Sequence, residues 1–116
     1  MPQVQGKGLK IFNYLLMNSI NKIKSDFEAI ELMKLFEIEV TNKETGEQDW
    51  IIFDISISGR TMYAQHESLT VKQQKSKKIA FVKIVLDPIF TLDQHLQDLH
   101  EACMMAISDS DFFELV

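Results

Sequence analysis

Three residues near the C-terminus, His95, His100 and Cys103, carry side chains that can bind a metal or act in catalysis. His100 and Cys103 are three positions apart, so they would share one face of a helix and could hold a metal together. His95 and His100 are five positions apart and would point about 140° away from each other. A third ligand, such as His66, would have to come from elsewhere in the fold.

The same segment offers a thiol beside an imidazole, the pair that nucleophilic catalysis uses. A reactive thiol needs partial exposure and positive surroundings. Cys103 instead continues an apolar stripe with Leu92, Leu96, Leu99 and Ile107, and free cysteines are commonly buried. We therefore expect solvated histidines and a buried thiol, and we predict no catalytic residue, no metal ligand and no cofactor.

Residues 59–68, GRTMYAQHES, form the densest group of polar side chains. Arg60, Tyr63 and His66 could orient a small ligand, and His66 with Glu67 or Tyr63 could serve acid–base chemistry. Tyr63 and His66 are separated by an odd number of positions, so in a strand they lie on opposite faces. We expect an exposed strand with assorted polar side chains rather than an active site.

The sequence contains no glycine-rich phosphate loop, HExxH motif or nucleophile elbow. A basic loop over residues 71–78 could contact phosphates, but it has neither arginine nor aromatic residues, and the chain has a net charge of -5. We therefore expect no nucleic-acid partner. No apolar run reaches the length of a membrane span, and a single cysteine fits a reducing compartment, so we expect a cytoplasmic protein.

The elements that would position these residues follow from periodicity. A chain of 116 residues with 46% hydrophobic residues is typical of one globular domain. Alternation predicts strands over 36–40, 49–58 and 61–69, and a run that is apolar on both faces predicts a strand over 79–86. Period 3.6 predicts helices over 8–35 and 91–107. The order α-β-β-β-β-α predicts an α+β two-layer sandwich, a four-stranded antiparallel meander with two helices on one face.

The first helix raises a question of domain boundaries. Its apolar stripe, from Leu9 to Ile30, runs through Asn18 and Ser19, two residues that usually begin helices. Either Ser19 caps a shorter helix and residues 1–17 form an arm, or the helix extension is continuous and packs on something, most simply a second copy. We favour an interruption near Asn18, with residues 18–116 as the single domain.

If both helices cover one face of the sheet, the other face presents large apolar side chains, those of Trp50, Ile52, Ile79, Phe81 and Val85. An apolar patch of that kind on a soluble protein marks an interface. We therefore expect a non-enzymatic protein-interaction or regulatory module that forms a homodimer. The alternative is a small-molecule-binding cup with an apolar pocket, in which Arg60, Tyr63 or His66 orients the ligand; an enzyme ranks third.

Charge is unevenly distributed along the chain. Residues 84–116 contain seven acidic residues and neither lysine nor arginine. Asp93, Asp98 and Glu101 place part of this charge on the exposed surface of the last predicted helix. Two interpretations remain open: the lysines of residues 71–78 neutralise this acidic surface within the chain or across a dimer, or the surface binds a basic protein partner.

Overall fold

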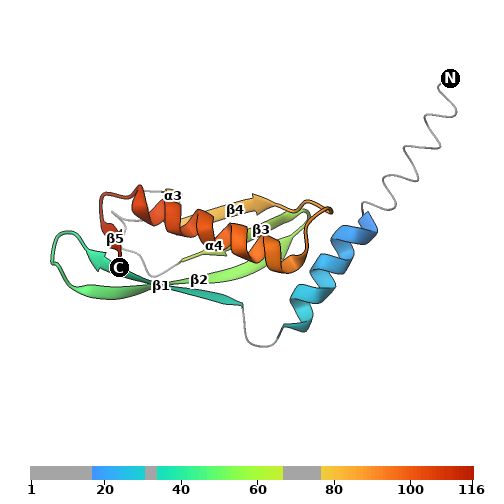
Figure 1. Cartoon of the computed structure of the whole chain (residues 1–116), viewed down its shortest axis with the longest axis horizontal. Coiled ribbons are helices and arrows are strands. Elements are labelled where there is room, and N and C mark those ends of the chain that lie inside the picture. Colours follow the sequence, from blue (N-terminus) through green and yellow to red (C-terminus); the bar gives the residue numbers. More distant parts are fainter. Residues whose placement is uncertain (1–16, 31–33, 67–76) are drawn as a thin grey trace, which may run out of the picture.

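The computed structural model describes residues 17–30, 34–66 and 77–116. Its five strands are β1 (Leu35–Asn42), β2 (Gln48–Ser58), β3 (Thr61–Gln65), β4 (Phe81–Val85) and β5 (Phe113–Leu115). They form one antiparallel sheet in the order β4-β3-β2-β1-β5 (Figure 1). The helical segments are residues 17–29, the one-turn α3 (Lys77–Ala80) and α4 (Leu92–Ser108). The predicted α+β fold with an antiparallel sheet is confirmed, with five strands instead of four.

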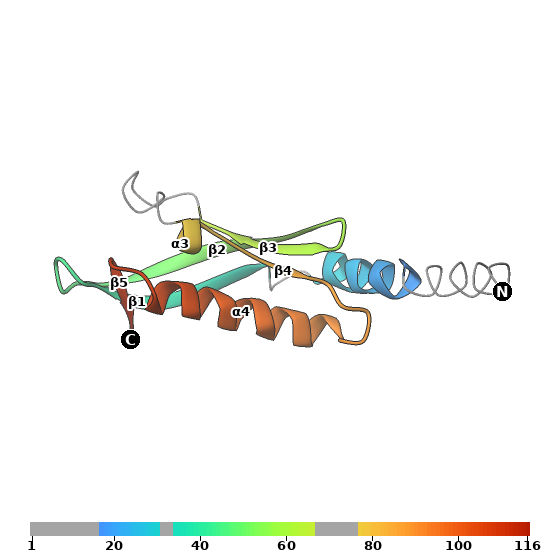
Figure 2. The same cartoon turned by 90° about the horizontal axis from the view of Figure 1, so that it is seen from above.

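The sheet has one buried face, and the period of two places its residues there. In β2, Ile51, Phe53 and Ile55 are buried, whereas the residues between them are exposed. The strand register puts Phe53 opposite the buried Phe36 of β1 and Ile55 opposite the buried Ala64 of β3. The buried residues therefore form one continuous layer, and α4 lies along this layer (Figure 2).

Helix α4 begins at a capping box formed by Thr91 and Gln94. The hydroxyl of Thr91 accepts a hydrogen bond from the backbone amide of Gln94, and the Gln94 side chain accepts one from the backbone amide of Thr91. The buried residues of α4 are Leu92, His95, Leu99, Cys103 and Ile107. The predicted stripe differs from this set at two positions, because His95 is buried and Leu96 is only half-buried.

Two short elements depart from the predicted pattern. Residues 77–80 form α3, so the strand expected over 79–86 begins only at Phe81. Ile79 of α3 is fully buried, and α3 packs against α4. At the other edge, the C-terminal residues form the strand β5, with Glu114 opposite Thr41 of β1.

The helix of residues 17–29 lies at one end of the sheet (Figure 1). Ile20, Ile23 and Phe27 are buried on one face of it, as the predicted stripe requires. Asn18 and Ser19 both lie inside the helix, so Ser19 does not cap it and the expected interruption near Asn18 is absent from residues 17–29. The remainder of the expected arm, residues 1–16, lies outside the described residues.

Candidate interaction surfaces

The face of the sheet opposite α4, called here the outer face, exposes several large apolar side chains. Trp50 is 54% exposed, Ile52 42%, Phe81 42% and Val85 68%. These are four of the five residues predicted for this face. Ile79, the fifth, is not part of it, because it belongs to α3 and is buried in the core. The prediction was wrong because the strand periodicity of residues 81–85 was extended to Ile79, which lies in a helix. Ile79 is apolar because it packs in the core.

The exposed apolar residues of β2 form a first group, the β2 patch, consisting of Trp50 and Ile52. On the neighbouring strand β1, the residue opposite Trp50 is Glu39 and the residue opposite Ile52 is Glu37. Both glutamates therefore point to the outer face beside the patch. The β2 patch is apolar with a negatively charged flank.

A second group, the β4 patch, consists of Phe81 and Val85 together with Tyr63 of β3. The rings of Tyr63 and Phe81 lie 5.2 Å apart, measured between their centres. Lys83 stands between Phe81 and Val85 on the same strand face and is opposite Tyr63 in the register. The β4 patch is therefore apolar with a positive charge in its middle. The polar pair Asp54–Gln65 separates it from the β2 patch.

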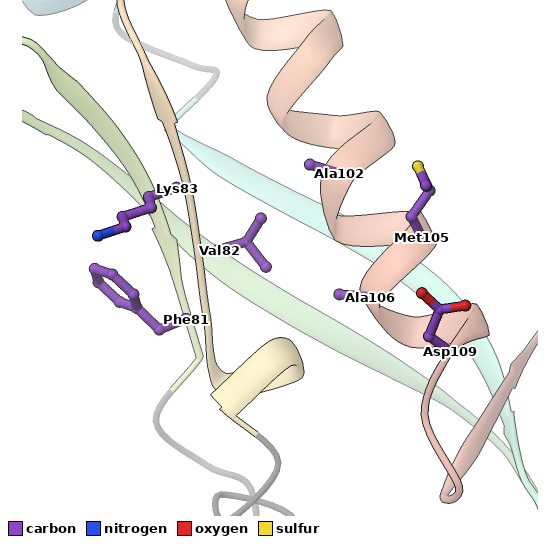
Figure 3. A pocket seen from close by; sticks show the side chains of 7 residues that line it. All are labelled: Phe81, Val82, Lys83, Ala102, Met105, Ala106 and Asp109. Carbon is purple, nitrogen blue, oxygen red and sulfur yellow. The ribbon is translucent and has the colours of Figure 1, made fainter.

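A groove of about 360 Å³ runs between β4 and α4 (Figure 3). Val82 points from β4 towards the helix, and the small side chains of Ala102 and Ala106 point back towards β4, while Phe81 and Lys83 turn the other way. Met105, Ala106 and Asp109 complete the helical side, and Met105 is 66% exposed. This groove was not predicted from the sequence, although Ala102 and Ala106 are four positions apart and so share one face of a helix.

A second hollow, of about 460 Å³, lies where the helix of residues 17–29 meets β2. It is lined by Lys24, Phe27, Glu28, Lys34, Ile55, Ser56 and Ile57. The Lys34 ammonium lies 5.5 Å from the centre of the Phe27 ring, which places a cation over an aromatic face. None of the residues predicted to orient a ligand lines either hollow.

Those three residues, Arg60, Tyr63 and His66, do not converge. Arg60 donates a hydrogen bond to the carbonyl oxygen of Leu86, and Tyr63 packs on Phe81 on the outer face. His66 faces the core side, where its ring lies 5.9 Å from that of Phe53. The odd spacing of Tyr63 and His66 thus separates them as predicted. Burial lowers the pKa of His66 below 6.5, and the charges of Asp54 and Asp49 partly oppose this.

The candidate catalytic and metal-binding residues of α4 serve the core. Cys103 is fully buried, and desolvation raises the pKa of its thiol from 9.0 to about 12. A thiol with so high a pKa is a poor nucleophile near neutral pH. His100 packs edge-on against Phe36, with ring centres 5.0 Å apart. His95, which we expected in solvent, is instead buried with both ring nitrogens hydrogen-bonded.

The acidic surface of α4 is exposed as predicted, since Asp93, Asp98 and Glu101 are all solvent-accessible. Asp93 lies in the first turn, where the helix dipole favours a negative charge. The lysine side chains of residues 71–78, one of the two predicted counterparts of this surface, lie outside the described side chains. The choice between an internal match and a basic partner therefore remains a prediction.

Metal sites and membrane spans were sought in the same residues. Among residues 17–30, 34–66 and 77–116, no group of three or more His, Cys, Asp or Glu side chains is arranged to hold a metal ion. In this part of the chain, no helix combines the length and apolar character needed to cross a bilayer.

Comparison with protein-family models finds no match, and comparisons with curated proteins and with solved structures also find none.

Proposed function

We propose that the protein is a non-enzymatic interaction module that forms a homodimer through the outer face of its sheet. The observation that carries this proposal is the exposure of Trp50, Ile52, Phe81 and Val85 on a face opposite α4. Large apolar side chains gathered on one face are unfavourably exposed to water in a monomer, and an interface removes them from water. A cytoplasmic location is part of the proposal, because a single cysteine suits a reducing compartment.

Charge complementarity supports a second copy as the partner of this face. In a two-fold dimer, both copies use the same surface. If one patch of the first copy packs on a different patch of the second copy, symmetry generates the reciprocal contact as well. The β2 patch has Glu37 and Glu39 at its flank, and the β4 patch has Lys83 at its centre. Packing the β2 patch of one copy on the β4 patch of the other brings opposite charges together at both contacts.

The test is the mass in solution together with a charge exchange. Light scattering of the wild type should give twice the chain mass of 13.4 kDa. Lys83→Glu alone, or Glu37→Lys with Glu39→Lys, should place like charges across the interface and weaken the dimer by about tenfold or more. The triple variant restores opposite charges and should recover much of the dimer.

Glu101→Lys provides the matched control, because Glu101 is exposed on α4, on the side of the sheet away from the outer face. It makes the same change of charge as either glutamate substitution alone, and it should leave the mass unchanged. A wild type that stays monomeric at a concentration of about 1 mM would reject the homodimer. A dimer that is weakened neither by Lys83→Glu nor by Glu37→Lys with Glu39→Lys would reject the outer face as its interface.

The small-molecule cup receives less support as a second candidate. A ligand site needs polar groups that converge on an enclosed apolar space. Arg60, Tyr63 and His66 lie at a turn, on the outer face and on the core face respectively.

A further inference from the structure

Strand β4 lies at an edge of the sheet, so only one of its two sides pairs with a neighbouring strand. The His66 amide bonds to the Ala80 carbonyl and the Leu86 amide bonds to the Arg60 carbonyl, so the even-numbered residues of β4 pair with β3. In an antiparallel ladder the alternate residues face the other way. The backbone groups of Lys83 and Val85 and the carbonyl of Phe81 therefore point away from β3, and none of the described residues bonds to them. The Phe81 amide closes the single turn of α3 instead.

The groove of Figure 3 runs beside this edge. A strand that paired with Phe81, Lys83 and Val85 would turn every second side chain towards α4. Those side chains would meet Ala102, Met105 and Ala106, which are small or apolar. The edge supplies backbone hydrogen bonds and the groove supplies side-chain contacts, the two components by which sheets bind extended peptides.

The charges beside the groove indicate the chemistry of the occupant. Asp109 lies at one end of the helical side, and Asp98 lies one turn before Ala102 on the same face of α4. The two aspartates are separated by about 16 Å along the helix axis, close to the span of about 17 Å covered by five strand residues. A strand bound here would thus have acidic groups near both ends and apolar groups at its centre.

A second copy fits this edge poorly. The antiparallel register that spans Phe81 to Val85 pairs Phe81 with Val85 and sets Lys83 opposite the second copy's Lys83. Like charges directly opposite each other destabilise a strand pair. Such a pairing would also bring together two α4 helices, in which residues 92–108 include acidic residues and no lysine or arginine.

We propose that β4 and α4 form a strand-addition site for an extended segment of a partner protein, with apolar residues at alternate positions and lysine or arginine at both ends. This site goes beyond the homodimer proposed above, because it uses the edge of β4 and the groove rather than the outer face. A dimer joined through its outer faces would carry two such sites.

The experiment uses the full chain and a synthetic peptide, Lys-Thr-Val-Thr-Val-Thr-Lys, with blocked ends. Its lysines and valines alternate with threonine, so they share the strand face that turns towards α4. Calorimetry should give a Kd in the range of about 1–100 µM. On binding, the amides of Lys83 and Val85 should become protected from hydrogen exchange, while those of Val82 and Ile84 are protected already.

Two substitutions of Lys83 separate the backbone from the side chain. Lys83→Pro removes an amide hydrogen that points away from β3, a position where an edge strand tolerates proline. Lys83→Thr removes the same charge and keeps the amide hydrogen. The proline variant should weaken peptide binding by at least about tenfold, whereas the threonine variant should stay within about threefold of the wild type.

A second pair of measurements does not depend on the fold of the proline variant. A peptide with N-methylated backbone amides on its pairing edge should lose binding to the wild type, because it cannot donate to β4. The double variant Asp98→Lys with Asp109→Lys should bind the lysine-ended peptide more weakly than the wild type does. It should bind a peptide with glutamate at both ends more tightly. Glu114→Lys, on the far edge, should change neither affinity.

The proposal is overturned if the peptide does not bind at about 1 mM, or if Lys83→Pro and Lys83→Thr bind it equally well. It is also overturned if the amides of Lys83 and Val85 are already protected in the free protein. Protection that disappears on dilution would assign the edge to a second copy, and protection that persists would assign it to a segment of the same chain.

Discussion

The backbone amide of Asp87 donates a hydrogen bond of 2.8 Å to Nε2 of His95, whose Nδ1 lies 2.8 Å from the carbonyl oxygen of Thr91. Because an amide nitrogen only donates, Nε2 accepts, and the neutral ring carries its hydrogen on Nδ1 and donates to Thr91. His95 is 2% exposed. One buried ring therefore fastens the connection after β4 to the first turn of α4.

Replacing His95 with alanine should destabilise the protein by about 2–4 kcal/mol, since it opens a cavity and leaves the backbone amide of Asp87 without its acceptor. Urea unfolding measures this directly. The matched control is Gln97→Ala, an exposed site on the same helix, which should stay within about 0.5 kcal/mol of the wild type. If both variants unfold alike, the ring does not stabilise the connection.

Ser110 joins α4 to β5, and its loss should detach the terminal strand. Its hydroxyl donates to the Ile107 carbonyl at 2.7 Å and accepts from the Phe113 amide at 3.2 Å, and the residue is 6% exposed. Ser110→Ala should cost about 1–3 kcal/mol because the Phe113 amide loses its acceptor. Ser108→Ala removes an exposed hydroxyl two residues earlier and should cost almost nothing. Equal hydrogen exchange at Phe113 in both variants would contradict the account.

The buried thiol makes stability depend on alkaline pH. The pKa of Cys103 rises from 9.0 to about 12 on folding, so above pH 9 the unfolded chain releases a proton that the folded chain retains. The free energy of unfolding should therefore fall as pH rises through this window, with a slope approaching about 1.4 kcal/mol per pH unit. Cys103→Ala lacks this contribution, so the stability difference between wild type and variant should shrink with pH. Parallel stability curves would show that the thiol ionises equally in both states.

His66 makes the stability of the protein depend on pH in the acidic range. Burial lowers its pKa below 6.5, so as pH falls the unfolded chain takes up a proton before the folded chain, and this contribution to stability is lost below that pH. Asp54 raises the pKa, so Asp54→Asn should lower it further. A proton NMR titration of the imidazole measures the midpoint, with Glu114→Gln as a control of equal charge change. A midpoint that rises in Asp54→Asn would contradict the assignment.

The sequence predicted the elements whose patterns are local. Alternation identified the buried face of β2, and the 3.6-residue period identified α4. The strand β5 was not predicted, because three residues are too few to show a periodicity. It is a strand only through its pairing with β1, about seventy positions earlier in the chain.

The remaining errors have a common physical cause. His95 was expected in solvent because polar residues are usually exposed, but its burial depends on the backbone groups of Asp87 and Thr91, which only the folded connection brings within reach. Ile79 was assigned to the outer face because a strand periodicity was extended into α3. The groove beside β4 depends on which strand lies at the edge, and strand order is a property of topology rather than of any local segment.

The most direct test of the outer-face dimer uses Trp50, the single tryptophan of the chain. Its side chain is 54% exposed on the outer face, so formation of the dimer would bury it. Dilution from about 100 µM to about 0.1 µM should shift its fluorescence emission to longer wavelength. The shift should coincide with the halving of the mass measured by light scattering, and Glu37→Lys with Glu39→Lys should move both transitions to higher concentration. An emission maximum that stays constant while the dimer dissociates would show that the outer face is not the interface.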